Sequence, residues 1–455
     1  MPTLPLVLSL LVACGGKAPG DTADTSAGPT PVAWSKVRAP LAQVSAGGRA
    51  WKRGIIHLHS HFSHDACDGD PMPGGVPDEA CLQDLRDAIC DSALDYAMLT
   101  DHPAHAGERP FADLFLLRGD DVLVDGVANR MACGSGQRPL VFPGVEDELM
   151  PVTLERHVAD TPAENERLYN GTDGETIDAE IAAGGKVLQA HTEGQPLAVL
   201  LERQALGQVG VEMFNLHAMV DPNKREEDLG LERFSYLDAL APFLNGETTT
   251  EPDLAFLGFY EEQGVSLEKW DALSAVAPTI GTAGTDAHQN ALPNLLSDGE
   301  RVDSYRRMIR WFSNILLVDG DTPADVEAAL AAGRNLVAFE VLGTPADFDV
   351  SYAVGQEAPL EMAGTGARGG SLRVTCPTLA ADTPQDGNLP EITVTVFKDG
   401  QAWAEGCGDY VLAEPGVYRV RADILPLHLQ GFLDASTAGL MKRFPWLYSG
   451  AFRVD

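Results

Sequence analysis

Basic residues are scarce in this sequence of 455 residues, since 32 Lys and Arg stand against 67 Asp and Glu, for a formal net charge of −35. Nucleic acids and anionic membrane surfaces are bound through clustered cations, so we expect neither as a partner. After the first fourteen residues, no apolar run approaches the roughly 20 residues that span a bilayer. The sequence also lacks a G-x-S-x-G motif, which argues against a serine nucleophile. A small molecule remains the expected substrate, because a local cationic centre can still accept a small anion.

The first fourteen residues, MPTLPLVLSLLVAC, are typical of an export signal. They end in Leu11-Val12-Ala13-Cys14, which resembles a bacterial lipobox, although no Lys or Arg precedes the apolar run. Residues 15–49 begin with a stretch rich in Gly, Pro, Thr and Asp and are predicted to form a flexible linker. We therefore expect an exported lipoprotein, at the periplasmic face of the outer membrane or at the cell surface, that contacts the membrane only through a lipid on Cys14.

Cysteine usage agrees with export. Of seven cysteines, six remain if Cys14 carries a lipid, and an even number suits an oxidising compartment. Six cysteines allow about fifteen pairings, which the sequence does not decide. The neatest local pair is Cys376 with Cys407, and the other four are expected to staple the first domain. Cys67 could also bind a metal as a thiolate, but a disulfide is favoured in this compartment.

From about residue 50 to residue 345, short apolar runs alternate with longer amphipathic stretches, which predicts an α/β fold built on a mostly parallel sheet. The strand-like runs are GIIHLHS, YAMLTDH, PLVFPGVE, KVLQAHT, VGVEMFN and IGTAGTDAH. Helical spacing is found in DEACLQDLRDAICDSAL, TIDAEIAAGG and TPADVEAALAAG. After residue 346 the runs SLRVTCPTL, EITVTVFKDG and GVYRVRADI alternate apolar and polar residues, which predicts a small antiparallel β-sandwich.

Most of the strand-like runs contain His, Glu or Asp at or near their ends. Since side chains at the carboxyl ends of parallel strands meet at one rim, residues far apart in the chain are expected to converge there. In chain order these residues are His57, His59, Asp65, Asp101, His102, Glu146, His191, Glu212, Asp286 and His288. Imidazole and carboxylate together suit Zn, Mn or Fe, and a carboxylate can bridge two ions. His57 and His59, spaced i and i+2 on a strand, are expected to bind one ion as a pair.

The segments HLHSHFSHD, MLTDH, PGVE, QAH and AGTDAH resemble, in this order, the motifs of the PHP superfamily, named for polymerase and histidinol phosphatase. The resemblance covers residues 54–345, and the run EKWDALSAVAPTIGTAGTDAH is most similar to a secreted branch that includes carbaryl hydrolases. It implies a distorted (β/α)7 barrel over residues 50–345, with two or three divalent ions at the carboxyl rim, followed by the β-sandwich domain of residues 346–455.

The resemblance also implies a ligand set. One ion takes His57, His59, Glu146 and Asp286; Glu146 bridges to a second ion that also takes His191; a third takes Asp65, His102 and His288. Glu212 is a further expected ligand, at a position where the family varies, and His217 is its nearest competitor. His64 and Asp68 compete with Asp65 for one ligand role, and Asp65 is favoured.

The function implied is hydrolysis of a phosphomonoester or phosphodiester by a metal-activated water, with His217 or His61 protonating the leaving group. Hydrolysis of a carboxylic or carbamate ester on the same centre is the alternative, because the same ions can polarise a carbonyl. A third reading is a surface-anchored binding protein without catalysis. It is disfavoured, since a decayed site should have lost ligands and here nearly all positions are filled. The oligomeric state stays open.

Overall fold

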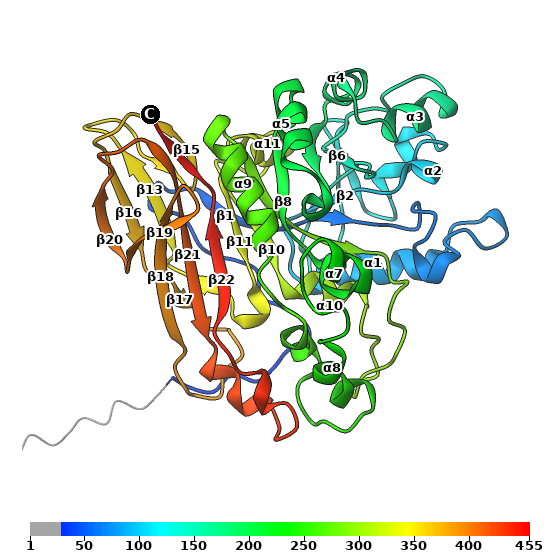
Figure 1. Ribbon diagram of the computed structural model, residues 1–455. Coiled ribbons are helices and arrows are strands. Elements are labelled where there is room, and N and C mark those ends of the chain that lie inside the picture. The colour runs from blue at the N-terminus through cyan, green and yellow to red at the C-terminus, as the bar shows by residue number, and fades with distance from the viewer. Residues whose placement is uncertain (1–28) are drawn as a thin grey trace, which may run out of the picture.

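Helices and strands alternate through the first two thirds of the chain, and mainly antiparallel strands make up the rest (Figure 1). The computed structural model describes residues 29–455, so the predicted signal peptide and Cys14 lie outside the described residues. Within that range, none of the helices is both long and apolar enough to cross a membrane. The α/β prediction is confirmed in its general form: a large mixed sheet is followed by a region of antiparallel strands.

The candidate site rests on a ring of strands that closes into a barrel. Its members are β1 (Ala50–Leu58), β2 (Tyr96–Leu99), β5 (Leu140–Phe142), β6 (Leu149–Val152), β7 (Lys186–Gln189), β8 (Gly210–Asn215) and β9 (Ile280–Ala287). Strand β1 pairs in parallel with β2 on one side and β9 on the other, β2 with β5, and β8 with both β7 and β9. Strand β6 runs antiparallel to β7, and the Leu154 amide donates to the Pro143 carbonyl to join β6 to the end of β5. A hairpin of β3 (Val122–Val124) and β4 (Ala128–Arg130) extends β5.

Apolar side chains fill the barrel. One buried cluster takes alternate residues of the ring strands, among them Ile56, Met98 and Leu188, as expected where every second side chain points inward. The same cluster includes Val326 and Leu330 of α11 (Pro323–Ala331), so this helix packs against the barrel interior. Metal-binding candidates therefore have to gather at the other end of the strands.

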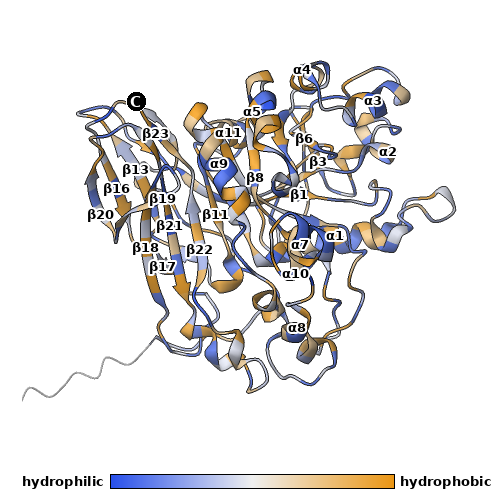
Figure 2. Cartoon of the chain, in the orientation of Figure 1, coloured by the Kyte–Doolittle hydropathy of each residue, from blue (hydrophilic) through white to orange (hydrophobic). Residues whose placement is uncertain are grey.

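Helices cover the outside of the barrel. They are α1 (Glu79–Asp91), α2 (Pro103–Ala106), α3 (Pro162–Tyr169), α4 (Gly174–Ala182), α5 (Leu197–Leu206), α6 (Leu216–Val220), α7 (Pro222–Glu227), α8 (Leu237–Leu244), α9 (Gly264–Val276) and α10 (Tyr305–Trp311). Figure 2 shows hydrophobic and hydrophilic segments side by side on α1, as expected of a helix with one face on a core. The three predicted helical stretches correspond to α1, α4 and α11.

The C-terminal strands continue the barrel sheet rather than forming a detached sandwich. Strand β1 also pairs with β10 (Ser313–Val318), β10 with β11 (Asn335–Ala338), and β11 with β22 (Phe444–Ser449). From β22 the sheet runs through β21 (Gly416–Leu425) and β18 (Glu391–Lys398) to β19 (Gln401–Glu405), with β23 (Phe452–Val454) and β15 (Gly364–Gly366) at one end. A smaller sheet contains β14 (Leu360–Glu361), β13 (Asp349–Ala353), β16 (Ser371–Thr375) and β20 (Gly408–Val411), and β12 (Pro345–Ala346) pairs with β17 (Thr378–Leu379). The antiparallel sheets predicted after residue 346 are present, but their core is continuous with that around the barrel.

Residues 29–49, the described part of the predicted linker, lie against the folded chain. The Trp34 ring packs edge-on against Phe432 at 5.5 Å, and its indole nitrogen donates to Asp253 Oδ2 at 3.0 Å. Arg38 reaches the buried carboxylate of Glu340 at 3.3 Å. A Pro- and Gly-rich composition predicted a tether here, but one Trp and one Arg provide enough apolar and charged contacts to dock the segment.

Three disulfides are present in the described residues: Cys67–Cys81, Cys90–Cys133 and Cys376–Cys407. This confirms the predicted pair in the C-terminal region and the predicted stapling of the first domain by the other four cysteines. Cys67 is therefore a disulfide partner and not a thiolate ligand.

Candidate metal centre

The carboxyl ends of the ring strands bring the predicted ligands together. Irregular backbone at three strand ends sets the direction of these side chains. His57, His191 and Asp286 have φ values of 69°, 48° and 50°, in the left-handed region that non-glycine residues seldom adopt. His57 also lies where the pairing of β1 with β2 and β9 shifts register, as in a β-bulge. Such strain is found where function holds a side chain in a fixed direction.

The first group of candidate ligands contains His57, His59 and Asp286. The Nε2 atoms of both histidines lie 3.3 Å from Asp286 Oδ1. Both nitrogens are buried and have no hydrogen-bond partner in residues 29–455. Ligand atoms about 2.1 Å from one tetrahedral ion lie roughly 3.4 Å apart, so the spacing fits a shared ion. The orphaned nitrogens and their spacing show that these residues could hold a divalent metal.

A second group surrounds His191. Its Nε2 lies 3.3 Å from Glu146 Oε1 and 3.5 Å from Asp286 Oδ2. His217 Nδ1 is 2.9 Å from the same Asp286 oxygen, and His191, His217 and Asp286 together offer three ligand atoms within 4.8 Å of one another. Asp286 therefore faces the first group with one oxygen and the second group with the other, as a bridging carboxylate would.

A third group lies on the side of His102. The Nε2 atoms of His102 and His288 are 3.3 Å apart, and Asp65 Oδ1 lies 3.4 Å from His288 and 3.7 Å from His102. The His59 ring stacks on that of His288 with centroids 3.7 Å apart, which places this group directly beside the first. The three groups thus form one continuous cluster.

Hydrogen bonds behind the cluster turn the imidazoles toward it. His57 Nδ1 donates to Glu212 Oε1 at 2.6 Å, and His59 Nδ1 donates to Ser63 Oγ at 2.7 Å. His102 and His288 donate from Nδ1 to the backbone carbonyls of Glu146 and Asp286, each at 3.0 Å. With Nδ1 occupied, each ring presents Nε2 as the free ligand atom, an arrangement that outer partners commonly impose on metal-binding histidines. These donor assignments follow from the hydrogen-bond network.

Glu212, expected as a ligand, has a different place. Its Oε1 accepts from His57, and its Oε2 accepts from the His191 backbone amide at 2.9 Å and from Asn215 Nδ2 at 2.8 Å. It belongs to none of the described groups that could hold an ion, whereas its competitor His217 does. The sequence motif predicts both residues close to the expected metal ions, but only the backbone path shows that Glu212 lies behind His57.

The charges of the cluster suit cations. Burial would raise the pKa of Asp286, but the surrounding imidazoles, His57 foremost, hold that pKa well below its usual range. Burial and the neighbouring His288 lower the pKa of His59, which keeps its ring neutral with a lone pair free. Burial also lowers the pKa of His57, but Glu212 and Asp286 outweigh it and raise that pKa, so a metal has to displace a proton there.

No protein-family model and no curated protein matches the sequence. Among solved structures, the chain is similar to a two-domain protein containing a predicted PHP-like metal-dependent phosphoesterase from Bacteroides vulgatus, with 12% identity and a TM-score of 0.37, over 90% of this chain and 99% of that one. It is also similar to PsfC from Pseudomonas syringae, with 14% identity and a TM-score of 0.31, over 60% of this chain and 84% of that one. Scores this low establish neither a common fold nor a common function.

A cavity of about 240 Å³ opens onto the cluster. Of the candidate ligands, Asp65, His102, His191, His217, Asp286 and His288 line it; the other lining residues are Val220, Gln289, Asn290, Ala291, Asp303 and Met308. Among these described lining residues there is no Lys or Arg. Asp303 is not free, because its carboxylate accepts from the amides of Ala291 and Leu292, both at 2.7 Å.

His61, one of the two predicted proton donors, does not line this cavity. Its side chain is fully buried against Phe62, with ring centroids 4.2 Å apart, and burial lowers its pKa to about 4. The other predicted donor, His217, lines the cavity with a side chain that is 42% exposed. Alternation along an extended strand would have kept His61 in line with His59, but the chain turns directly after β1.

Sequence reasoning missed the supporting residues. Ser63 accepts from His59 and donates to Asp101 at 3.3 Å, and Glu193 Oε1 lies 3.5 Å from His191 Nδ1. Asp101 ends a strand-like run and is a candidate ligand, but its carboxylate accepts hydrogen bonds from the Ser60 amide and hydroxyl, a role that the sequence pattern does not indicate. Glu193 follows His191 by two residues. This short spacing is the one feature of the sequence that could indicate a contact between the two side chains.

Proposed function

We propose that this protein is a metal-dependent hydrolase of the PHP superfamily that cleaves phosphoesters with two or three divalent ions. The observation that carries the proposal is the set of imidazole and carboxylate atoms spaced 2.9 to 3.7 Å apart in three adjoining groups. The order of motifs along the sequence supports the superfamily assignment, and the branch of carbaryl hydrolases stays a prediction from the same motifs.

Bound ions would supply Lewis acidity and an activated water at neutral pH. Asp286 and Glu146 would hold such ions with anionic carboxylates, because the pKa values of both are held below their usual range despite burial, mainly by His57 for Asp286 and by His102 for Glu146. We assign His217 to the second ion together with His191, because its Nδ1 faces Asp286 within the ligand group. Its exposed edge also faces the cavity, where it can contact the substrate.

The cavity lining narrows the substrate class. Without a cationic side chain among its described residues, the cavity offers an anion only the cluster itself. Val220, Ala291 and Met308 are apolar, and Gln289 and Asn290 offer neutral hydrogen bonds. This lining supports an ester with one small anionic group and an otherwise neutral remainder, and disfavours nucleotides with further phosphates.

The same lining favours one second candidate. A neutral carboxylic or carbamate ester needs no cationic side chain beyond the cluster, so hydrolysis at a carbonyl is compatible with this cavity. An exported location is proposed with either activity, and three disulfides support it because they persist in oxidising compartments.

The test is a substrate panel with purified protein and added Mn²⁺ or Zn²⁺. p-Nitrophenyl phosphate and bis-p-nitrophenyl phosphate report phosphoester cleavage, and p-nitrophenyl acetate reports attack at a carbonyl. Asp286→Asn is the inactive control, since it removes the charge shared by two ligand groups. We expect release from at least one phosphate ester that Asp286→Asn abolishes. Activity on the acetate alone would favour the second candidate, and no activity on any of the three would contradict an enzyme.

A further inference from the structure

We propose that the Cys67–Cys81 disulfide fixes the loop that carries Asp65, and thereby sets the affinity of the centre for the ion held by His102, His288 and Asp65. This inference rests on the proposed metal centre and concerns its third group of ligands. The two histidines follow strands of the barrel, whereas Asp65 comes from the loop between β1 and α1. The barrel strands therefore fix the positions of His102 and His288 but not the position of Asp65.

The Asp65 side chain is not held by its own contacts. It is 39% exposed, and its Oδ1, the atom that faces the two histidines, has no hydrogen-bond partner among the described residues. Where this carboxylate lies is therefore decided by the backbone of residues 63–70. Anything that loosens this backbone changes the distance from Asp65 to His102 and His288.

Hydrogen bonds join that backbone to the segment of the other ligand. The Cys67 amide donates to the His288 carbonyl at 2.9 Å, and the Asp68 amide donates to the Gln289 carbonyl at 3.0 Å. Asn290 Nδ2 donates to the Asp65 carbonyl at 2.9 Å. Cys67 is thus both a disulfide partner and the residue whose amide binds the backbone of a candidate ligand.

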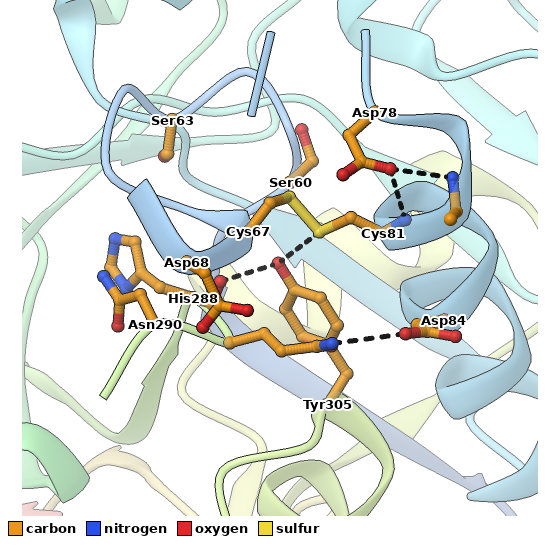
Figure 3. The surroundings of a disulfide bond; sticks show 12 residues. Ser60, Ser63, Cys67, Asp68, Asp78, Cys81, Asp84, His288, Asn290 and Tyr305 are labelled. Atoms are coloured by element: carbon orange, nitrogen blue, oxygen red, sulfur yellow. Dashed lines mark hydrogen bonds between the residues drawn. A yellow bond between two sulfur atoms is a disulfide. The ribbon is translucent and has the colours of Figure 1, made fainter. Parts of the chain in front are cut away.

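The disulfide anchors this contact to α1. Cys67 and Cys81 are buried, and Figure 3 shows their bond beside Tyr305, whose hydroxyl lies 3.9 Å from Cys81 Sγ and donates to the His288 carbonyl at 3.2 Å. Asp78 caps α1 by accepting from the amides of Ala80 and Cys81. The first turn of α1, which carries Cys81, is therefore held in place. One side of the third ligand group is therefore tied to a helix through a single covalent bond.

The backbone of this loop is strained and needs a restraint such as the disulfide. Cys67 and Asp68 have φ values of 56° and 58°, in the left-handed region, and neither is a glycine. Such residues relax unless their surroundings hold them. The hydrogen bonds to residues 288–290 hold one side of this loop, and Arg301 pairs with Asp68 at 2.8 Å, but the Asp68 side chain is 59% exposed and such pairs are weak. The disulfide is the stronger restraint.

The experiment compares two disulfide deletions on the same helix. Cys67→Ala with Cys81→Ala removes the proposed restraint, and Cys90→Ala with Cys133→Ala removes the other disulfide of α1, which adjoins no candidate ligand. Each protein is titrated with Mn²⁺, and the bound equivalents are counted by elemental analysis after gel filtration. We expect the wild type and the control to bind equally, and the first variant to lose one equivalent or to bind its weakest ion at least tenfold less tightly.

Two results would overturn the inference. One is unchanged binding in the first variant, within twofold; the other is an equal loss in both variants, which would indicate general loosening. A wild type that binds no Mn²⁺ would overturn the proposed function as well, and so is distinguishable from failure of the inference alone.

Further variants keep the test informative. Asp65→Asn should lose the same ion, and adding Cys67→Ala and Cys81→Ala to Asp65→Asn should cause no further loss, because the disulfide acts through Asp65; additive losses would contradict the inference. Circular dichroism checks folding. If the double variant does not fold, Tyr305→Phe replaces it: removing the hydroxyl should weaken the same ion by about fivefold and spare the others. No change in Tyr305→Phe would then overturn the inference.

Discussion

Replacing Glu212 with Gln should weaken metal binding without removing a ligand. The Glu212 carboxylate accepts three hydrogen bonds, from His57 Nδ1 at 2.6 Å, the His191 amide at 2.9 Å and Asn215 Nδ2 at 2.8 Å. All three partners are donors, so the NH2 group of Gln must face one of them. Loss of one hydrogen bond to a buried charged group costs about 1.5–3 kcal/mol, which corresponds to roughly 10- to 100-fold in affinity.

The assay is competitive Zn²⁺ titration against a chromophoric chelator, with Glu180→Gln as the matched control. Glu180 is fully buried and its carboxylate has no hydrogen-bond partner within residues 29–455, but it belongs to none of the candidate ligand groups. We expect the control to bind like the wild type, and Glu212→Gln to bind 10- to 100-fold less tightly with the same number of ions. Wild-type affinity in Glu212→Gln would refute the supporting role, and the loss of a whole equivalent would restore Glu212 as a ligand.

Three other predictions concern the site and its frame. His217→Ala should lower kcat/KM by about 100-fold or more, whereas His61→Gln should stay within about threefold, as steady-state kinetics with p-nitrophenyl phosphate would reveal. Burial raises the pKa of Glu340, but the charges of Arg38 and Arg53 have the larger effect and lower this pKa from 4.5 to about 2. Its contribution to the free energy of unfolding, roughly 3 kcal/mol, should be complete above pH 4.5 and lost as the pH falls toward 2; urea unfolding at several pH values tests this, and a flat profile would contradict it. Trp34→Ala should lower the free energy of unfolding by about 2 kcal/mol, below the range for fully buried aromatics, and no change would mean that residues 29–49 are not docked.

The ligand cluster follows largely from sequence because its members end strands. His57, His191 and Asp286 each come at the carboxyl end of an apolar run, and parallel strands of one ring must bring such positions together. The disulfide prediction had a similar basis, since Cys376 and Cys407 lie close together in one β region.

What the sequence could not decide depends on the backbone path after each strand. Glu212 and His217 are five residues apart in one segment, and only the turn from β8 into α6 puts the first behind His57 and the second beside Asp286. His61 follows the HxH spacing, but the chain leaves the strand after β1 and buries it away from the cavity. Composition likewise could not show that Trp34 docks residues 29–49 on the folded chain. One Trp that packs on Phe432 hardly changes the amino-acid composition of a segment rich in Pro and Gly.

The metal content of the purified protein tests the central claim most directly. Wild type and Asp286→Asn are dialysed against Mn²⁺ or Zn²⁺, passed over gel filtration and measured by elemental analysis. Since Asp286 faces His57 and His59 with one oxygen and His191 and His217 with the other, its neutral variant should lose at least one ion. We predict two or three equivalents in the wild type and fewer in the variant; a wild type that holds no more metal than Asp286→Asn would contradict the account.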